Sequence, residues 1–259
     1  MKKLLLAAVL MASATVFAQG PFDGTWMTKL DTAKFPTKPD KYSLSNNMYE
    51  CLSCVPKYAV KADGTDQKVT GHAYYDTVAV KVVNASSIEI ITKKDGKTMF
   101  TGTRTVSPDG NTLDEKFTDT TEAKPVTGEI ISTRVSPGAA GSHAIAGAWR
   151  TSKVDTVSSN GLTVTYQGTN DGLKMSDPNG ESYDAKFDGK DYPIEGDPGH
   201  TMVSLKRIGA DTIEETDKRD GKVVGVSRMT VSKDGKSIQV EYNDKQQGTT
   251  TSFTMEKQS

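Results

Sequence analysis

Apolar and polar residues alternate in short runs along most of this chain. In the run Leu162–Tyr166 the apolar side chains share one face, and the opposite face carries threonines. Runs with the same period of two residues occur at Val78–Val82 and at Ile238–Tyr242. This period is typical of half-buried β-strands, and after residue 18 no stretch of helix length has the 3.6-residue period of a helix. The pattern predicts an all-β protein.

Asp-Gly pairs separate many of these runs. They begin at residues 63, 95, 109, 188, 220 and 234. Asp-Gly favours a tight hairpin, because both central residues of a type I′ turn need positive φ. Short strands joined in this way form an antiparallel up-and-down meander, whose open edges would aggregate unless the sheet closes or packs. We expect a small barrel of about eight to ten strands in each unit, with room for side chains or one small ligand.

The second half of the chain repeats the first. Residues 58–119 align without a gap on residues 183–244, and 21 of the 62 pairs are identical. With a two-residue adjustment, Gly24-Thr25-Trp26 aligns with Gly147-Ala148-Trp149. Self-similarity of this kind indicates an internal duplication.

The duplication predicts two domains of ordinary size, at 19–135 and 147–259. Residues 136–146 are small and rich in glycine and alanine, so we expect them to form a flexible linker. Two tandem β-barrels are therefore predicted. The alternative is one larger composite sheet built from both repeats.

Residues 1–18 have the pattern of a secretory signal peptide. Lys2-Lys3 is the charged start, Leu4–Leu10 is the apolar stretch, and Val16 and Ala18 fit the cleavage site. The apolar stretch is shorter than the roughly 20 residues of a spanning helix, so we expect no integral membrane segment in the mature chain. The predicted location is periplasmic or extracellular.

Composition excludes several classes of protein. The chain is 35% hydrophobic and 25% charged, too apolar for a disordered protein, and its two cysteines are too few for a disulfide scaffold. Its net charge is -1, and removal of the two signal-peptide lysines leaves 30 basic and 33 acidic residues, a net charge of -3. A nucleic-acid partner would require a basic excess, so none is expected.

The two tryptophans open the two repeats. Trp26 and Trp149 each end a Gly-x-Trp triplet, and a cation stands near the end of each repeat, Arg134 in the first and Lys257 in the second. This arrangement resembles the calycin superfamily of lipocalins, fatty-acid-binding proteins and avidins. There, a first-strand Gly-x-Trp closes the barrel end beneath a cation from the last strand. The resemblance implies two structural locks, Trp26 with Arg134 and Trp149 with Lys257.

The second repeat also resembles uncharacterised secreted bacterial β-rich proteins, through Tyr183–Pro193, Ser204–Ile208 and Asp217–Lys222. That likeness implies a fold and a secreted location but no known activity. The chain departs from each calycin family: it lacks the C-terminal helix of lipocalins, the helical lid of fatty-acid-binding proteins and the additional tryptophans of the avidin biotin site. Biotin is therefore not an expected ligand.

Cys51 and Cys54 form a Cys-x-x-Cys motif with several interpretations. A redox motif would need a following helix, covalent haem would need histidine where Val55 stands, and zinc would need two further ligands. We expect a structural disulfide, with a redox motif and free thiols as the alternatives. Neither a metal nor a cofactor is predicted.

Several aromatic residues lie close to predicted turns. Rings with a polar tip suit the rim of a ligand pocket, although cross-strand pairing would favour the same positions. A loop histidine at a barrel mouth could contact an anion, or it could simply be solvated. The candidate ligand-binding residues are Tyr58, Tyr75, Tyr183, Tyr192 and His200.

The sequence has no Gly-x-Ser-x-Gly, His-Glu-x-x-His or phosphate-loop motif, so we do not expect an enzyme. The architecture and the calycin resemblance predict a secreted, non-catalytic binding protein whose partner is a small, partly apolar molecule. The alternative is a structural or protein-interaction module with filled barrels and no ligand. The oligomeric state is left open.

Overall fold

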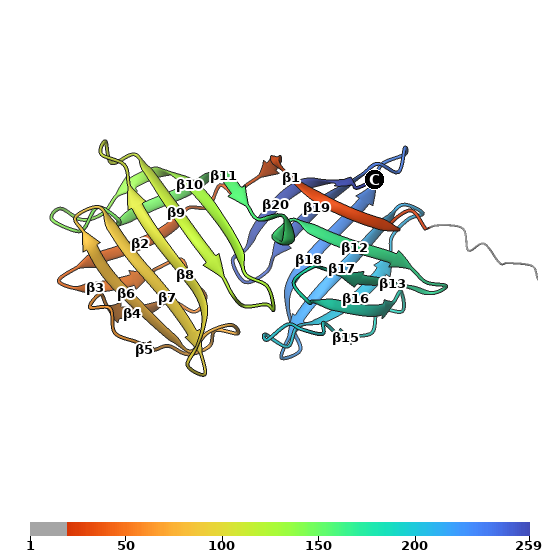
Figure 1. The fold of residues 1–259 in the computed structure, drawn as a ribbon, viewed down its shortest axis with the longest axis horizontal. Helices are drawn as coiled ribbons and strands as arrows, with labels where there is room; N and C mark the ends of the chain where they lie inside the picture. The colour runs from red at the N-terminus through yellow and green to blue at the C-terminus, as the bar shows by residue number, and fades with distance from the viewer. Residues whose placement is uncertain (1–19) are drawn as a thin grey trace, which may run out of the picture.

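The computed structural model describes residues 20–259, and the predicted signal peptide at 1–18 lies outside them. Within this range the backbone is almost entirely β, with one short 3₁₀ turn, η1 (Ser159–Gly161). The strands form two antiparallel sheets of ten strands each, and each sheet closes nearly completely into a barrel (Figure 1). The predicted tandem double barrel is therefore confirmed. No helix of the described residues is long and apolar enough to cross a membrane.

The first barrel is built mainly from the first repeat. Its strands are β2 (Asp40–Ser45), β3 (Met48–Cys51), β4 (Tyr58–Lys61), β5 (Gln67–Lys68), β6 (Thr77–Asn84), β7 (Ser87–Lys94), β8 (Lys97–Val106), β9 (Thr112–Asp119), β10 (Val126–Pro137) and β11 (Gly147–Val157).

The second barrel is built mainly from the second repeat. Its strands are β12 (Thr163–Gly168), β13 (Gly172–Ser176), β14 (Ser182–Lys186), β15 (Tyr192–Pro193), β16 (Met202–Arg207), β17 (Thr212–Arg219), β18 (Lys222–Val231), β19 (Ser237–Asp244), β20 (Thr249–Lys257) and β1 (Gly24–Lys34).

The two repeats exchange their first strands. β1 lies between β12 and β20 of the second repeat, and β11 lies between β10 and β2 of the first (Figure 1). Pairing with the nearest strand explains this topology, because the chain leaves β10 and returns directly as its antiparallel neighbour β11. β1 then fills the vacant place in the second barrel. The repeats found in the sequence therefore do not coincide with the barrels.

The predicted linker at 136–146 is largely part of the first barrel. β10 extends to Pro137, and Ile145 is fully buried in the core of that barrel. The His143 ring bonds the carbonyl oxygen of Asn84 at 2.7 Å. A segment with these contacts is held in place, so the expectation of a flexible linker was wrong at its C-terminal end.

The hairpins at 95–96 and 220–221 have the expected geometry. Asp95 and Gly96 have φ of 51° and 81°, and Asp220 and Gly221 have φ of 49° and 73°. Positive φ at both central residues is the requirement of a type I′ turn. These turns join β7 to β8 and β17 to β18, the long hairpins that form one wall of each barrel.

Candidate functional site

Each barrel is closed at one end by a tryptophan and a cation. The Arg134 guanidinium lies over the Trp149 ring, 3.9 Å from its centroid, and the Lys257 ammonium lies 5.3 Å from the centroid of Trp26. Both indoles are almost completely buried. The expected pairs, Trp26 with Arg134 and Trp149 with Lys257, were wrong. The exchange of first strands gives each tryptophan the cation of the other repeat.

The glycine of each Gly-x-Trp triplet makes room for that cation. Gly24 and Gly147 have φ of 131° and 137°, a region that side chains disfavour. A Cβ at Gly24 would lie 2.6 Å from Cε of Lys257, and one at Gly147 would lie 2.9 Å from Nη1 of Arg134. The triplet is therefore a structural requirement of the lock.

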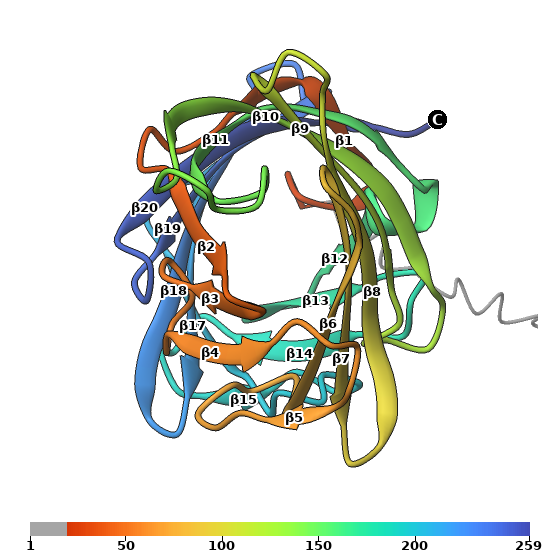
Figure 2. The ribbon, with the colours of Figure 1, turned by 90° about the vertical axis from the view of Figure 1, so that its left-hand side faces the viewer.

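The first barrel holds a chamber of about 510 Å³. Figure 2 looks along this barrel and shows its strands arranged as a ring. The apolar part of the chamber wall consists of Tyr58, Tyr74, Tyr75, Ile90, Met99 and Phe100. A volume of this size lies within the usual range of small-molecule sites.

The polar part of the wall includes one member of an ion pair, Arg104, beside Thr92, Asp119, Thr121, Glu122 and Glu181. Arg104 on β8 and Glu115 on β9 are cross-strand partners, 3.0 Å apart between Nη2 and Oε1, and their side chains are only 14% and 16% exposed. Arg104 also donates to the Tyr49 hydroxyl at 3.0 Å and lies over the Tyr42 ring. A guanidinium has five N–H donors, and the Nε–H of Arg104 is buried with no acceptor among the described residues.

Tyrosines surround this ion pair. The rings of Tyr42 and Tyr49 stack at 6.1 Å, and the Tyr58 ring follows at 6.3 Å from Tyr49. Burial raises the pKa of all three phenols, and it does so even though the charge of Arg104 acts in the opposite direction. These hydroxyls therefore remain protonated and can donate hydrogen bonds at neutral pH.

Tyr75 lines the chamber, and His72 stacks on it from the neighbouring cleft between the barrels. The two rings stack with centroids 4.3 Å apart, and the Tyr75 ring meets Tyr58 edge to face at 6.4 Å. Burial lowers the pKa of His72, which favours the neutral imidazole. Two of the predicted ligand residues, Tyr58 and Tyr75, thus lie together at the chamber.

Carboxylates stand at the mouth of the chamber, and one comes from the second repeat. Glu122 and Glu181 both line the chamber, and with Asp177 they form a group whose oxygens lie within 4.8 Å of one another. Burial, together with the charges of neighbouring carboxylates, raises the pKa of both glutamates to about 7. Carboxylate oxygens of this kind are the ligands that hard cations prefer.

The remaining predicted ligand residues lie in the second barrel. Tyr183 is buried in its core and donates to Glu215 at 2.5 Å, and Tyr192 donates to Asp188 at 3.1 Å. His200 is exposed, in a loop at a φ of 54°. The structure therefore does not bring Tyr183, Tyr192 and His200 into the first-barrel chamber.

The interiors of the two barrels have diverged. Glu215 is half-buried in the second barrel, where loss of solvent and then the charge of Asp217 raise its pKa to about 7. In the repeat alignment, Arg104 and Glu115 correspond to Met229 and Val240. Sequence reasoning missed Arg104 and Glu115. The signal that could have revealed them is in the alignment, where a charged pair in the first repeat corresponds to an apolar pair in the second.

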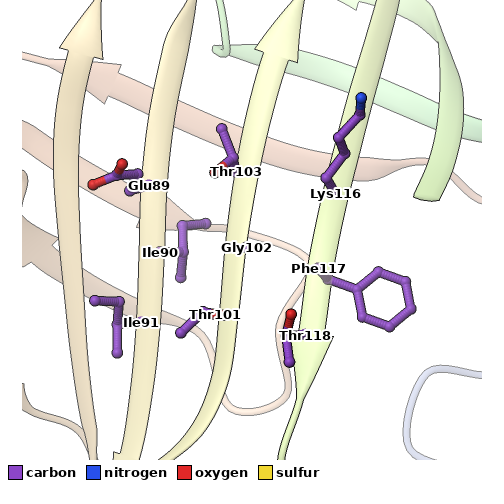
Figure 3. Close-up of a pocket in the computed structure, with 9 residues that line it drawn as sticks. All are labelled: Glu89, Ile90, Ile91, Thr101, Gly102, Thr103, Lys116, Phe117 and Thr118. Atoms are coloured by element: carbon purple, nitrogen blue, oxygen red, sulfur yellow. The ribbon is translucent and has the colours of Figure 1, made fainter. Parts of the chain in front are cut away.

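A separate hollow of about 420 Å³ lies against strands β7, β8 and β9 (Figure 3). Gly102 on β8 is one of the lining residues, and a Cβ at that position would lie 2.8 Å from the Phe100 ring. The stacked rings of Phe100 and Phe117, with centroids 6.0 Å apart, occupy the space that Gly102 leaves free. Thr101 and Thr103 alternate with these inward-facing residues and belong to the outer wall.

Cys51 and Cys54 are joined by a disulfide. The bridge follows β3, and Cys54 lines the chamber. Leu52 and Ser53, the residues between the two cysteines, form a tight loop rather than the start of a helix. The surroundings of the bridge therefore agree with a structural disulfide, because no helix follows it as a redox motif would require.

Comparison of the chain with protein-family models, with curated proteins and with solved structures gives no match.

Proposed function

We propose that the protein is a secreted, non-catalytic binding protein that holds one small, partly apolar molecule in the chamber of the first barrel. The observation that carries this proposal is a chamber of about 510 Å³ whose aromatic and aliphatic wall contains a guanidinium with a buried Nε–H that has no acceptor among the described residues. A few well-placed polar groups in an otherwise apolar pocket are typical of small-molecule sites.

The wall indicates the chemistry of the ligand. Ile90, Met99 and Phe100 favour an apolar body. Arg104 favours a hydrogen-bond acceptor on that body, because its unpartnered Nε–H is kept from water when the chamber is occupied and an acceptor on the ligand would satisfy it. The ion pair with Glu115 neutralises the charge of Arg104, so a neutral carbonyl or ether serves as well as a carboxylate.

The calycin resemblance supports the same proposal, since carriers of that superfamily hold small molecules inside a β-barrel. The signal-peptide pattern of residues 1–18 and the Cys51–Cys54 disulfide support export to an oxidising compartment. The alternative, an interaction module with filled barrels, differs in one measurable respect: it takes up no small molecule.

Binding of N-phenylnaphthylamine, a neutral fluorescent probe, tests the proposal. The probe should brighten on the wild-type protein, with one probe per chain. Thr92→Phe fills the chamber from β7 and should abolish binding. Thr101→Phe places the same side chain on the outer wall and should leave binding unchanged.

Equal binding to both variants would place the probe elsewhere and contradict the proposal. Absence of probe binding to the wild type would favour the filled-barrel alternative.

A further inference from the structure

Tyr74 stands where the two barrels meet. It lies in the loop between β5 and β6 of the first repeat and lines the mouth of the first-barrel chamber. It also lines a cleft of about 690 Å³ between the barrels. Tyr74 therefore lies between the chamber and the cleft, as Cys54 and Tyr75 also do.

The residues that hold the Tyr74 ring, Arg219 and Gly199, belong to the second repeat. Nη2 of Arg219 donates to the Tyr74 hydroxyl at 2.6 Å, and its guanidinium lies over the same ring, 4.7 Å from the centroid. On another side, a Cβ at Gly199 would lie 2.9 Å from the ring, so only glycine admits it there. The ring is thus held by hydrogen bonding, by cation–π attraction and by close packing.

Arg219 is itself fixed in position. Its Nε donates to Oγ1 of Thr201 at 2.9 Å, and the backbone N–H of Thr201 donates to the Asp197 carboxylate at 2.7 Å. The same carboxylate accepts from the N–H of Gly199 at 2.9 Å. One loop of the second barrel therefore orients both Arg219 and the glycine against which Tyr74 packs.

We infer that Arg219 is a positioning residue for the first-barrel chamber: it holds Tyr74 at the mouth, and the second barrel thereby sets how fast a ligand enters and leaves. The inference rests on the proposed function. Arg219 does not line the chamber, so it acts on the ligand only through Tyr74. It gives the second repeat a second role at the chamber, besides the contribution of Glu181 to its lining.

Stopped-flow kinetics of N-phenylnaphthylamine tests this inference in the full chain. Arg219→Met removes the hydrogen bond and the cation, and the probe should dissociate about tenfold faster. Tyr74→Phe removes only the hydroxyl, and we expect an increase of about threefold. In the Arg219→Met background, Tyr74→Phe should not raise the dissociation rate further, because the hydrogen bond between Arg219 and Tyr74 is already lost.

Arg207→Met is the matched control. Arg207 also lies over an aromatic ring of the second barrel, 4.5 Å from the centroid of Phe187. Its removal should leave both probe rates unchanged. Unaltered rates in Arg219→Met, or effects of Arg219→Met and Tyr74→Phe that multiply, would overturn the inference.

Hydrogen exchange separates this inference from the proposed function. The backbone amides of residues 72–76 should exchange faster in Arg219→Met than in wild type or Arg207→Met. If the wild type binds no probe, the proposed function fails, and exchange alone decides whether Arg219 holds the mouth. Unchanged exchange at 72–76 would then overturn the inference as well.

Discussion

Arg134 lies over the ring of Trp149, 3.9 Å from its centroid, although the two residues belong to different repeats. The indole N–H of Trp149 donates to the carbonyl oxygen of Ile145 at 2.9 Å, and that of Trp26 donates to Phe22 at 2.8 Å. The two locks have the same arrangement of tryptophan, carbonyl and cation, and each joins the start of one repeat to the end of the other. The repeats therefore stabilise each other as one unit.

The two locks should differ in strength. Besides covering Trp149, Arg134 donates to the carbonyl oxygens of Ala144 and Ala146 at 2.8 and 2.9 Å. Lys257 is exposed and more distant from its ring. Arg134→Met should lower the free energy of unfolding by about 2 to 3 kcal/mol, and Lys257→Met by about 0.5 kcal/mol. Urea unfolding followed by tryptophan fluorescence measures both. Equal losses would show that the carbonyl contacts contribute nothing.

The strand exchange can be tested by cross-linking. The Thr25 and Thr165 hydroxyls lie 2.9 Å apart, because β1 pairs with β12. The double variant Thr25→Cys, Thr165→Cys should form a second disulfide within the chain, seen as a loss of two further hydrogens by mass spectrometry of non-reduced protein. Two free thiols at these positions would place β1 in the barrel of its own repeat.

Breaking the ion pair of Arg104 and Glu115 should lower the free energy of unfolding, whereas replacing both residues with apolar ones should change it little. Arg104→Met leaves the Glu115 carboxylate buried without its partner, and we expect a loss of about 3 kcal/mol in the free energy of unfolding. Adding Glu115→Val gives the first barrel the residues that the second barrel has at Met229 and Val240. The double variant should recover most of the loss in chemical denaturation. No recovery would mean that Arg104 stabilises the fold through Tyr49 and Tyr42 instead.

Glu122 and Glu181 should make stability depend on pH near neutrality. Each has a pKa of about 7 in the folded chain against 4.5 without these surroundings, so folding favours the protonated form. The free energy of unfolding should therefore fall as pH rises from about 4.5 to about 7. Glu122→Gln and Glu181→Gln remove this loss, and each should be more stable than wild type by about 1 kcal/mol at pH 8, after allowance for solvent screening.

Thermal unfolding at pH 4 and pH 8 checks this expectation, with Glu89→Gln on the outer wall as the control. The advantage of the two mouth variants should vanish at pH 4. An advantage that is equal at both pH values would rule out the ionisation of these carboxylates as its cause.

The fold could be predicted from the sequence because its determinants are local. Alternation specifies which face of a strand is buried, and turns such as Asp95-Gly96 specify antiparallel hairpins. The strand exchange is a different matter. The Gly-x-Trp strands at Gly24 and Gly147 carry the same pattern, so nothing in either strand distinguishes the two barrels. Only the short connection from β10 to β11 decides which barrel each strand enters.

The site could be predicted only in part. Tyr58 begins β4, and Tyr75 lies in the loop just before β6. Both positions are beside turns, and both residues line the chamber. The position equivalent to Tyr58 in the second repeat is Tyr183, which donates a hydrogen bond to the half-buried Glu215 of the second barrel. Glu181 reaches the chamber from the other repeat, and no pattern within a single repeat indicates a contact between barrels.

Native mass spectrometry of the chain isolated from the cells that make it tests the central claim, that the first-barrel chamber holds a small molecule. Wild type should carry one non-covalent mass that is lost on denaturation and identifies the ligand, and the chamber-filled Thr92→Phe protein should be bare. The same bound mass on both proteins would contradict the claim. So would a bare wild-type chain that also takes up no N-phenylnaphthylamine.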